Sequence, residues 1–262
     1  MFDSDADRRV DLTHLVSYAI DSEFASEIDD AISIESLENG RERIWIHIAD
    51  VGRWISPNSE LAREAKERTS TVHMPDLRVP MLPESLSSKL LSLAAPSETS
   101  VSALSCGVEL DASGEIASYQ LCMSKIKPAK RLTYHKVDNL LQTASRSAVF
   151  SNASSSTESP EANRAAGAEQ KQPCHECEPQ LLHDIARLNT LAQSRFAYRQ
   201  RHGAVDGFLR DKTDLSISAK MEGLPPAETW SLSGYFAWAN RSSVALVSEY
   251  MFMMSHCAGL FA

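Results

Sequence analysis

Alternating apolar side chains in residues 44–49 constrain the fold most strongly. In "RIWIHIADV", isoleucine alternates with Trp45, His47 and Ala49, and a period of two predicts a strand with one well-buried face. The apolar run "AISIESL" precedes it, with the turn sequence "ENG" between them, so we predict a β-hairpin. The segment "VSALSCGVELDASGEIASYQLCMSKI" predicts a second hairpin, which turns at residues 111–114.

Helical patterns surround these strands. Residues 56–70 predict a helix with Ser56 as N-cap and Pro57 at the first helical position. Residues 179–201 and the apolar segment from about Tyr235 to the end also predict helices. Residues 143–173 are rich in Ser, Ala and Glu, and we interpret them as a disordered surface insertion. The expected fold is α+β, a mixed sheet with helices packed around it.

Composition narrows the functional class. The 262 residues carry a formal net charge of −9 with a pI near 5.4, so a nucleic acid would have to be bound by a local groove. This acidic balance counts against DNA as a partner. We expect no membrane partner, because no stretch looks long and apolar enough to cross a bilayer. Five unevenly spaced cysteines and the lack of a signal-like N-terminus predict an intracellular, reducing compartment, cytoplasmic or organellar.

A dense acidic segment stands out in "YAIDSEFASEIDDAIS". Asp21 ends one strand-like run, and Asp29 and Asp30 begin the next, so the carboxylates should meet at one edge of the sheet. Two such charges about 4 Å apart repel by roughly 4 kcal/mol at an effective dielectric near 20. Oxygen ligands at this density suit Mg²⁺ or Mn²⁺. A solvated acidic loop is the alternative; the spacing does not match a calcium-binding EF-hand loop.

Several quoted segments in order resemble one known family. "YAIDSEFASEIDDAISIE", "WIHIADVGRWISP", "RVPMLPESLSSKLLSL", "RLTYHKV" and "SRFAYRQRHGAVDG" are similar to the catalytic RNB domain of ribonucleases II and R. The resemblance covers residues 11–262, after a short N-terminal tail formed by residues 1–10. It implies a processive, magnesium-dependent exoribonuclease that degrades single-stranded RNA from its 3′ end to nucleoside 5′-monophosphates.

The resemblance also implies roles for individual residues. By motif position, Asp21 and Asp30 correspond to metal-holding carboxylates, and Asp29 to the aspartate most critical for cleavage. Glu27 stands where many members have aspartate, so its role in the metal site is less defined. Tyr134 matches an aromatic residue that stacks on bases, which suits an enzyme that accepts any sequence, or else it is a core aromatic. His73 replaces a stacking tyrosine of some relatives.

Two weaker signals lie outside the acidic segment. Arg195, Arg199 and Arg201 form the most basic stretch, which either lines an RNA channel or is a solvated helix face. The "CHEC" pair, Cys174 and Cys177, is read as incidental thiols rather than a zinc site, because a structural zinc needs four ligands.

The resemblance implies parts that this chain does not contain. Relatives carry a phosphate-gripping arginine segment after the point where the chain stops, cold-shock domains before the catalytic domain and an S1 domain after it. We therefore expect an RNB domain truncated at its C-terminal end, which binds RNA weakly and is inactive or poorly active alone. The rival hypothesis is a non-catalytic RNA-binding or interaction protein derived from the same fold.

Overall fold

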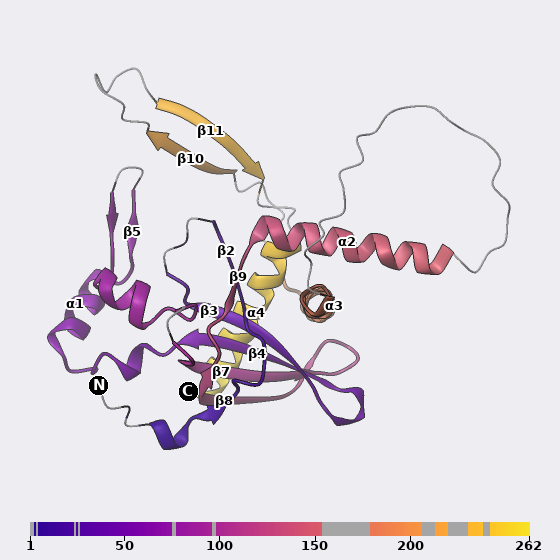
Figure 1. Cartoon of the computed structure of the whole chain (residues 1–262), viewed down its shortest axis with the longest axis horizontal. Coiled ribbons are helices and arrows are strands. Elements are labelled where there is room, and N and C mark those ends of the chain that lie inside the picture. Colours follow the sequence, from indigo (N-terminus) through magenta and orange to yellow (C-terminus); the bar gives the residue numbers. More distant parts are fainter. Residues whose placement is uncertain are drawn as a thin grey trace.

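The structure is a computed structural model that describes residues 3, 5–23, 25, 27–74, 77–95, 98–153, 179–205, 213–219, 230–237 and 242–262. Its centre is a seven-stranded mixed sheet in the order β1-β8-β7-β4-β3-β2-β9 (Figure 1). The strands are β1 (Val10–Asp11), β2 (Tyr18–Asp21), β3 (Asp30–Ser36), β4 (Glu42–Ala49), β7 (Val101–Leu110), β8 (Ile116–Ile126) and β9 (Lys130–Thr133).

The two predicted hairpins form the middle of this sheet. Strands β3 and β4 pair antiparallel with Ile32 opposite Ile46, and β7 and β8 pair antiparallel around the turn at residues 111–114. The outer strands β1 and β9 pair parallel with β8 and β2. Gly114 adopts φ +86° in the second turn, a conformation that glycine reaches without steric cost. Both hairpins, and the α+β class, are confirmed.

Three long helices cover one face of the sheet: α2 (Tyr134–Ala153), α3 (Pro179–Arg201) and α4 (Ser242–Phe261). Their buried side chains form one core with alternate residues of the strands. The isoleucines at 44 and 46 belong to this core, as the alternating pattern predicted. Helix α4 is long and apolar enough, by length and composition, to cross a membrane, which corrects our expectation that no stretch is. In this fold its residues Leu246, Tyr250, Met253 and Cys257 are buried in the core.

The opposite face of the sheet has a second core around Trp45, Leu93 and Ile126. His47 lies here, fully buried, with Ser33 Oγ 2.8 Å from its Nε2 and Ser105 Oγ 2.7 Å from its Nδ1. Burial lowers the pKa of His47 to about 3, so the ring is neutral at physiological pH. It is a core hydrogen-bonding residue.

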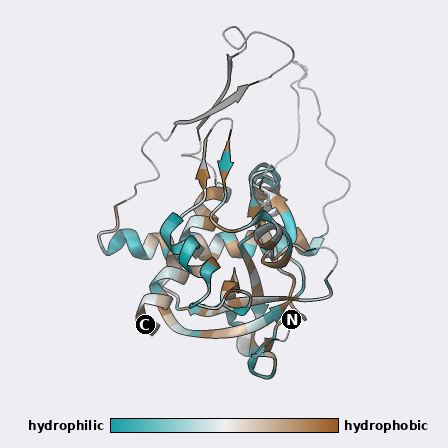
Figure 2. Ribbon diagram, turned by 90° about the vertical axis from the view of Figure 1, so that its left-hand side faces the viewer, coloured by the Kyte–Doolittle hydropathy of each residue, from teal (hydrophilic) through white to brown (hydrophobic). Residues whose placement is uncertain are grey.

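Smaller elements complete the fold. They are η1 (Ala6–Arg8), η2 (Glu38–Gly40), η3 (Val51–Arg53), α1 (Glu60–Arg68), η4 (Leu86–Leu90), the hairpin β5 (Val72–His73) and β6 (Arg78–Val79), and the hairpin β10 (Thr213–Ala219) and β11 (Trp230–Ala237). The β5–β6 hairpin projects from the body and carries hydrophobic and hydrophilic residues (Figure 2).

The structure corrects three boundaries. Helix α1 is capped by Ser59, whose side chain accepts from the Ala62 N–H, and not by Ser56. Helix α2 continues through Ala153, so residues 143–153 are helical rather than part of a disordered insertion, and residues 154–178, including the CHEC pair, lie outside the described residues. The N-terminal segment is not a loose tail, because the buried Arg9 pairs with Asp3 and Asp50.

Candidate functional site

The acidic segment is built on the ends of two neighbouring strands. Asp21 is the last residue of β2 and Asp30 the first of β3, and the two strands are antiparallel neighbours. The connection is tied to the body: the Asp29 carbonyl accepts from Ala49 N (2.8 Å), and the carbonyl of the buried Ile28 accepts from Leu93 N (2.9 Å). Residues 28–30 are therefore fixed to the packed domain, whereas Ser22 and Glu23 are exposed to solvent.

The three aspartates affect one another electrostatically. Burial, and then the charges of Asp21 and Asp29, raise the pKa of Asp30 to about 6. The pKa of Asp29 is raised by burial and by the charges of Glu27 and Asp21, and that of Asp21 is raised by burial. A raised pKa means that the ionised carboxylates are disfavoured where they stand. A cation among them would remove this penalty.

Glu27 forms an ion pair with an arginine. Its Oε1 lies 2.5 Å from Nη2 of Arg78, which belongs to β6. Both side chains are largely shielded from water, with exposures of 20% for Glu27 and 27% for Arg78. This pairing argues against the metal-ligand role that the resemblance left open for Glu27.

Asp21, Asp29 and Asp30 are suitable ligands for a hard cation, but their side chains are not arranged around one point. Within the described ranges, no three His, Cys, Asp or Glu side chains surround a common point closely enough to hold a metal ion. An all-oxygen donor set of Asp21, Asp29 and Asp30, with raised pKa values, nevertheless suits Mg²⁺ or Mn²⁺.

Tyr134 lies beside the aspartates because of the parallel pairing of β2 with β9. Thr133, the last residue of β9, is the register partner of Asp21, and Tyr134 follows it directly. Burial, and then the charges of Asp21 and Asp30, raise the pKa of Tyr134 to about 12. The ring also packs against the helical core, so the two sequence interpretations of Tyr134 are compatible.

A mostly apolar cavity of about 570 Å³ opens next to the acids. Asp29 and Glu27 form part of its wall, and the side chain of Asp29 is exposed to solvent. Helix α1 contributes Ala65 and Lys66, and the buried Ser87 of η4 lines it as well. Asp29 is therefore the aspartate most accessible from this cavity.

The predicted RNA-binding arginines of α3 lie away from the acids. Arg195 donates to the Gly114 carbonyl and Arg201 to that of Ser113, both in the β7–β8 turn. Arg199 pairs through two 2.8 Å contacts with the buried Glu249 of α4. That turn lies at the end of the sheet opposite the acids, about 20 Å along β7 at the usual rise per residue. These contacts favour a structural role for the three arginines.

Two arginines that the sequence did not single out lie close to the acids. Arg131 of β9 lowers the pKa of Asp21, although less than burial raises it, and donates to the Ala25 carbonyl. Arg78 likewise lowers the pKa of Asp29, against the larger effect of burial. The backbone register of the hairpin pairs Arg78 with His73, whose own side chain is outside the described part. Only the tertiary contacts reveal these two cations.

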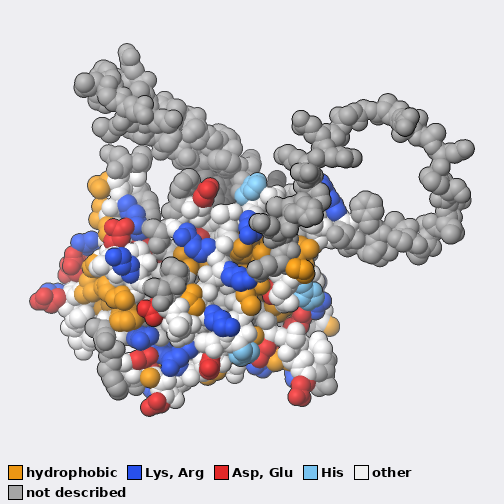
Figure 3. All heavy atoms as spheres, viewed as in Figure 1, with side chains coloured by type: hydrophobic (Ala, Val, Ile, Leu, Met, Phe, Trp, Pro, Cys, Tyr) orange, Lys and Arg blue, Asp and Glu red, His pale blue; other side chains and the backbone are white. Residues whose placement is uncertain are grey.

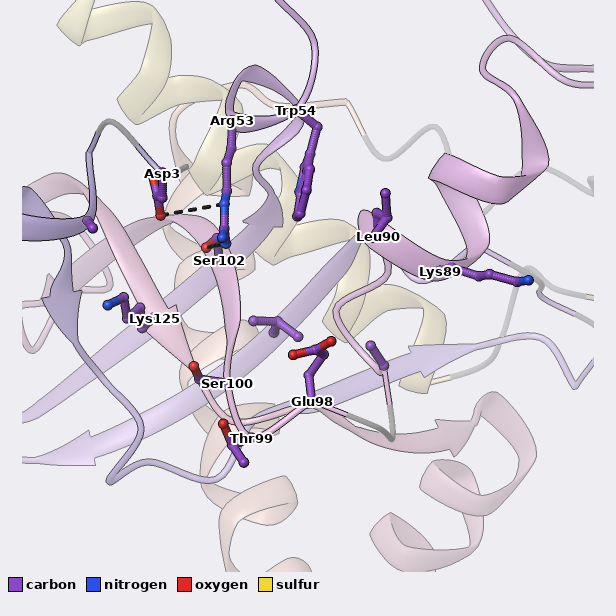
Figure 4. A pocket seen from close by; sticks show the side chains of 13 residues that line it. Asp3, Arg53, Trp54, Lys89, Leu90, Glu98, Thr99, Ser100, Ser102 and Lys125 are labelled. Carbon is purple, nitrogen blue, oxygen red and sulfur yellow. Dashed lines mark hydrogen bonds and ion pairs between the residues drawn. The ribbon is translucent and has the colours of Figure 1, made fainter. Parts of the chain in front are cut away.

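A second cavity, of about 310 Å³, lies between η3 and the start of β7 (Figure 4). Its charged residues include Asp3, Arg53, Lys89 and Lys125. Arg53 pairs with Asp3 at 3.5 Å and donates to the Ser102 hydroxyl. This cavity contains none of the aspartates of the acidic segment.

Figure 3 shows positive and negative side chains interspersed over the face seen in Figure 1, with no continuous basic surface there.

The fold is that of the ribonuclease R class. The chain superimposes with a TM-score of 0.67 on Mycoplasma genitalium RNase R in complex with ribose-methylated single-stranded RNA, at 23% identity, over 96% of this chain and 33% of that one. It also matches yeast Ssd1, a pseudonuclease, with a TM-score of 0.59 and 19% identity, over 95% of this chain and 25% of that one.

The chain belongs to the RNB domain family, whose model matches residues 9–262. It is 43% identical over 139 residues to the chloroplastic/mitochondrial ribonuclease II of Arabidopsis thaliana, and 37% identical over 139 residues to a ribonuclease R of Lactococcus lactis. These alignments cover 53% of this chain but only 17% and 21% of the relatives. The chain thus spans about a fifth of the length of these curated relatives.

Proposed function

We propose that this chain is the catalytic part of a magnesium-dependent exoribonuclease that degrades single-stranded RNA from its 3′ end to nucleoside 5′-monophosphates. The observation that supports it most directly is the group of three neighbouring aspartates with raised pKa values at the edge of an RNB-type sheet. The named relatives are ribonucleases, and one neighbouring structure holds single-stranded RNA.

In this proposal the aspartates hold the metal and the cavity admits the RNA end. Asp21 and Asp30, at the two strand ends, would hold Mg²⁺ or Mn²⁺, and Asp29 would face the scissile phosphate from the cavity wall. When bound, the ion supplies an activated water and neutralises charge that develops on phosphate oxygens. The rigid backbone bonds of Ile28 and Asp29 keep the acids in position.

Base stacking would allow the enzyme to act on any sequence. Tyr134 adjoins Asp21 and Asp30, and an aromatic ring stacks on every base with roughly 1–3 kcal/mol. His73 stays a predicted stacking residue on the hairpin. The arginines of α3 have no part in this site, for the reasons given by their contacts.

The relatives support a compartment as well. They include a chloroplastic/mitochondrial enzyme and an uncharacterized ribonuclease of Synechocystis. We propose that this protein works inside a cell or organelle, in agreement with the free thiols of Cys106, Cys122 and Cys257.

The test is a single-turnover assay with protein in excess over a uniformly labelled, unstructured RNA, because weak binding by the chain would hide activity at low protein concentration. We expect nucleoside 5′-monophosphates to accumulate with Mg²⁺ or Mn²⁺, and not with EDTA. Asp29→Asn should abolish their release, while Asp11→Asn, which removes an exposed carboxylate on β1, should not. Monophosphate release that Asp29→Asn leaves unchanged would refute the proposal.

A non-catalytic RNA-binding protein is the second candidate. It is favoured by the carboxylate oxygens that do not converge and by the fold shared with a pseudonuclease. Under this alternative the chain would bind RNA without hydrolysing it, and Mn²⁺ titration would detect no site that depends on Asp30.

A further inference from the structure

We propose that Arg78 binds the RNA phosphate backbone at the entrance to the acidic site, and that Glu27 is the positioning residue that holds its guanidinium there instead of ligating metal. This inference rests on the proposed function, since it assigns these two residues to the binding of the same substrate. It gives the site a cation that comes from the β5–β6 hairpin.

The contact between Glu27 and Arg78 joins two parts of the chain that are otherwise held separately. The acidic segment is fixed by its backbone bonds to β4 and to Leu93. The hairpin is fixed at its base, where Arg68 donates to the Pro80 carbonyl (2.7 Å) and Met81 N donates to Thr71 Oγ1 (3.0 Å). The 2.5 Å pair then sets where Arg78 lies relative to the aspartates.

The limited exposure of both side chains makes this pair more than an ordinary surface contact. Exposed ion pairs contribute little because water and salt screen them, whereas at 20% and 27% exposure much of that screening is removed. The charge of Arg78 also reaches Asp29, whose pKa it lowers against the larger effect of burial. Arg78 is thus within electrostatic range of the aspartate that lines the cavity.

The chemistry of the guanidinium suits a phosphodiester. Arginine presents five N–H donors in a planar fork and is well suited to recognise phosphate oxygens. An RNA strand that enters an acidic site meets repulsion from Asp21, Asp29 and Asp30, so a fixed cation at the entrance offsets that repulsion. Glutamate at position 27 has one methylene more than the aspartate that the resemblance places there, and its carboxylate contacts Arg78.

Salt-dependent RNA binding tests the phosphate contact. Binding of a labelled single-stranded RNA to the full 262-residue chain is measured in Ca²⁺ between 20 and 200 mM salt, with RNA integrity checked afterwards. Each phosphate contact with single strands contributes about 0.7 to the slope of log affinity against log salt. Arg78→Gln should reduce the slope by about this amount and weaken binding by about tenfold. Arg63→Gln, at an exposed position of α1, removes the same charge and should leave the slope unchanged.

The double variant tests whether Glu27 acts through Arg78. Glu27→Gln should reduce affinity, and combining it with Arg78→Gln should cause no further loss. In Mn²⁺ titrations without RNA, Glu27→Gln should keep the metal affinity within about twofold, whereas Asp30→Asn should lower it more than tenfold. Thermal unfolding of each variant shows whether the fold is retained.

The outcomes separate this inference from the proposed function. An unchanged slope for Arg78→Gln, or a Glu27→Gln loss of Mn²⁺ affinity equal to that of Asp30→Asn, would overturn the inference while the proposed function stands. A wild-type chain that neither binds RNA nor hydrolyses it would overturn both.

Discussion

Replacing Asp30 by asparagine should stabilise the metal-free protein while it destroys the proposed metal site. Asp30 is half-buried near Asp21 and Asp29, and its pKa is raised from 3.8 to about 6. At 1.36 kcal/mol per unit, a rise of this size corresponds to about 3 kcal/mol of unfavourable free energy for the ionised form. Partial solvent screening reduces the figure, so we expect asparagine to stabilise the fold by about 1–2 kcal/mol.

The pH dependence has a definite sign. A carboxyl whose pKa is higher in the folded protein than in the unfolded chain makes folding less favourable as the pH rises from 3.8 through 6. The stability difference between Asp30→Asn and wild type should therefore be largest above pH 7 and should shrink as the pH falls below 5. Urea unfolding in EDTA at pH 7.5 and pH 4.5 measures it, with Asp11→Asn as the exposed control.

Magnesium should make wild type more stable than Asp30→Asn. A ligand that binds only the folded state at a hundredfold excess over its Kd stabilises it by about 2.7 kcal/mol. Adding Mg²⁺ at pH 7.5 should therefore raise the unfolding midpoint of wild type and leave that of Asp30→Asn nearly unchanged. If Asp30→Asn is less stable than wild type in EDTA at pH 7.5, the electrostatic reasoning about this site is wrong.

Three further predictions concern other residues. Tyr134→Ala should weaken RNA binding in Ca²⁺ by roughly 1–3 kcal/mol of lost stacking, whereas Tyr134→Phe should keep most of the affinity; equal losses would exclude stacking. His47→Ala leaves the buried hydroxyls of Ser33 and Ser105 without the ring, so urea unfolding should show a loss of about 2–4 kcal/mol. Because burial lowers the pKa of His47 from 6.5 in the unfolded chain to about 3 in the fold, the stability advantage of wild type over His47→Ala should be full above pH 6.5 and decrease as the pH falls below it. Gly114→Ala should destabilise by about 1–3 kcal/mol, because φ is +86° and a Cβ would lie 2.3 Å from a backbone oxygen of α3; an unchanged unfolding midpoint would contradict this.

The local periodicities predicted much of the sheet. Alternation in residues 44–49 determines which side chains face each core, because successive residues of a strand point to opposite faces. The turn at residues 111–114 was also predictable, because Asp and Gly favour the backbone conformations of tight turns. Helix ends were less predictable: Ser56 and Ser59 are both suitable caps, and only the path of the chain into α1 selects Ser59.

The candidate site was also only partly predictable from the sequence. The strand-loop-strand pattern around Asp21 and Asp30 predicted that acids would gather at one edge, and the register of β2 with β3 confirms that both lie at neighbouring strand ends. The basic stretch on α3 looked equally suited to RNA or to solvent. Its contacts with Glu249 and with the β7–β8 turn favour a structural role.

The sequence by itself determined the two central hairpins, the acidic segment and the family, because these depend on residue types at short spacings. Only the tertiary structure decided which charges meet. Arg78 lies far along the chain from Glu27, and Tyr134 much farther from Asp21, yet the hairpin contact and the β2–β9 pairing bring each pair together. Electrostatic energy depends on distance in space and on burial, and neither can be read from the order of residues.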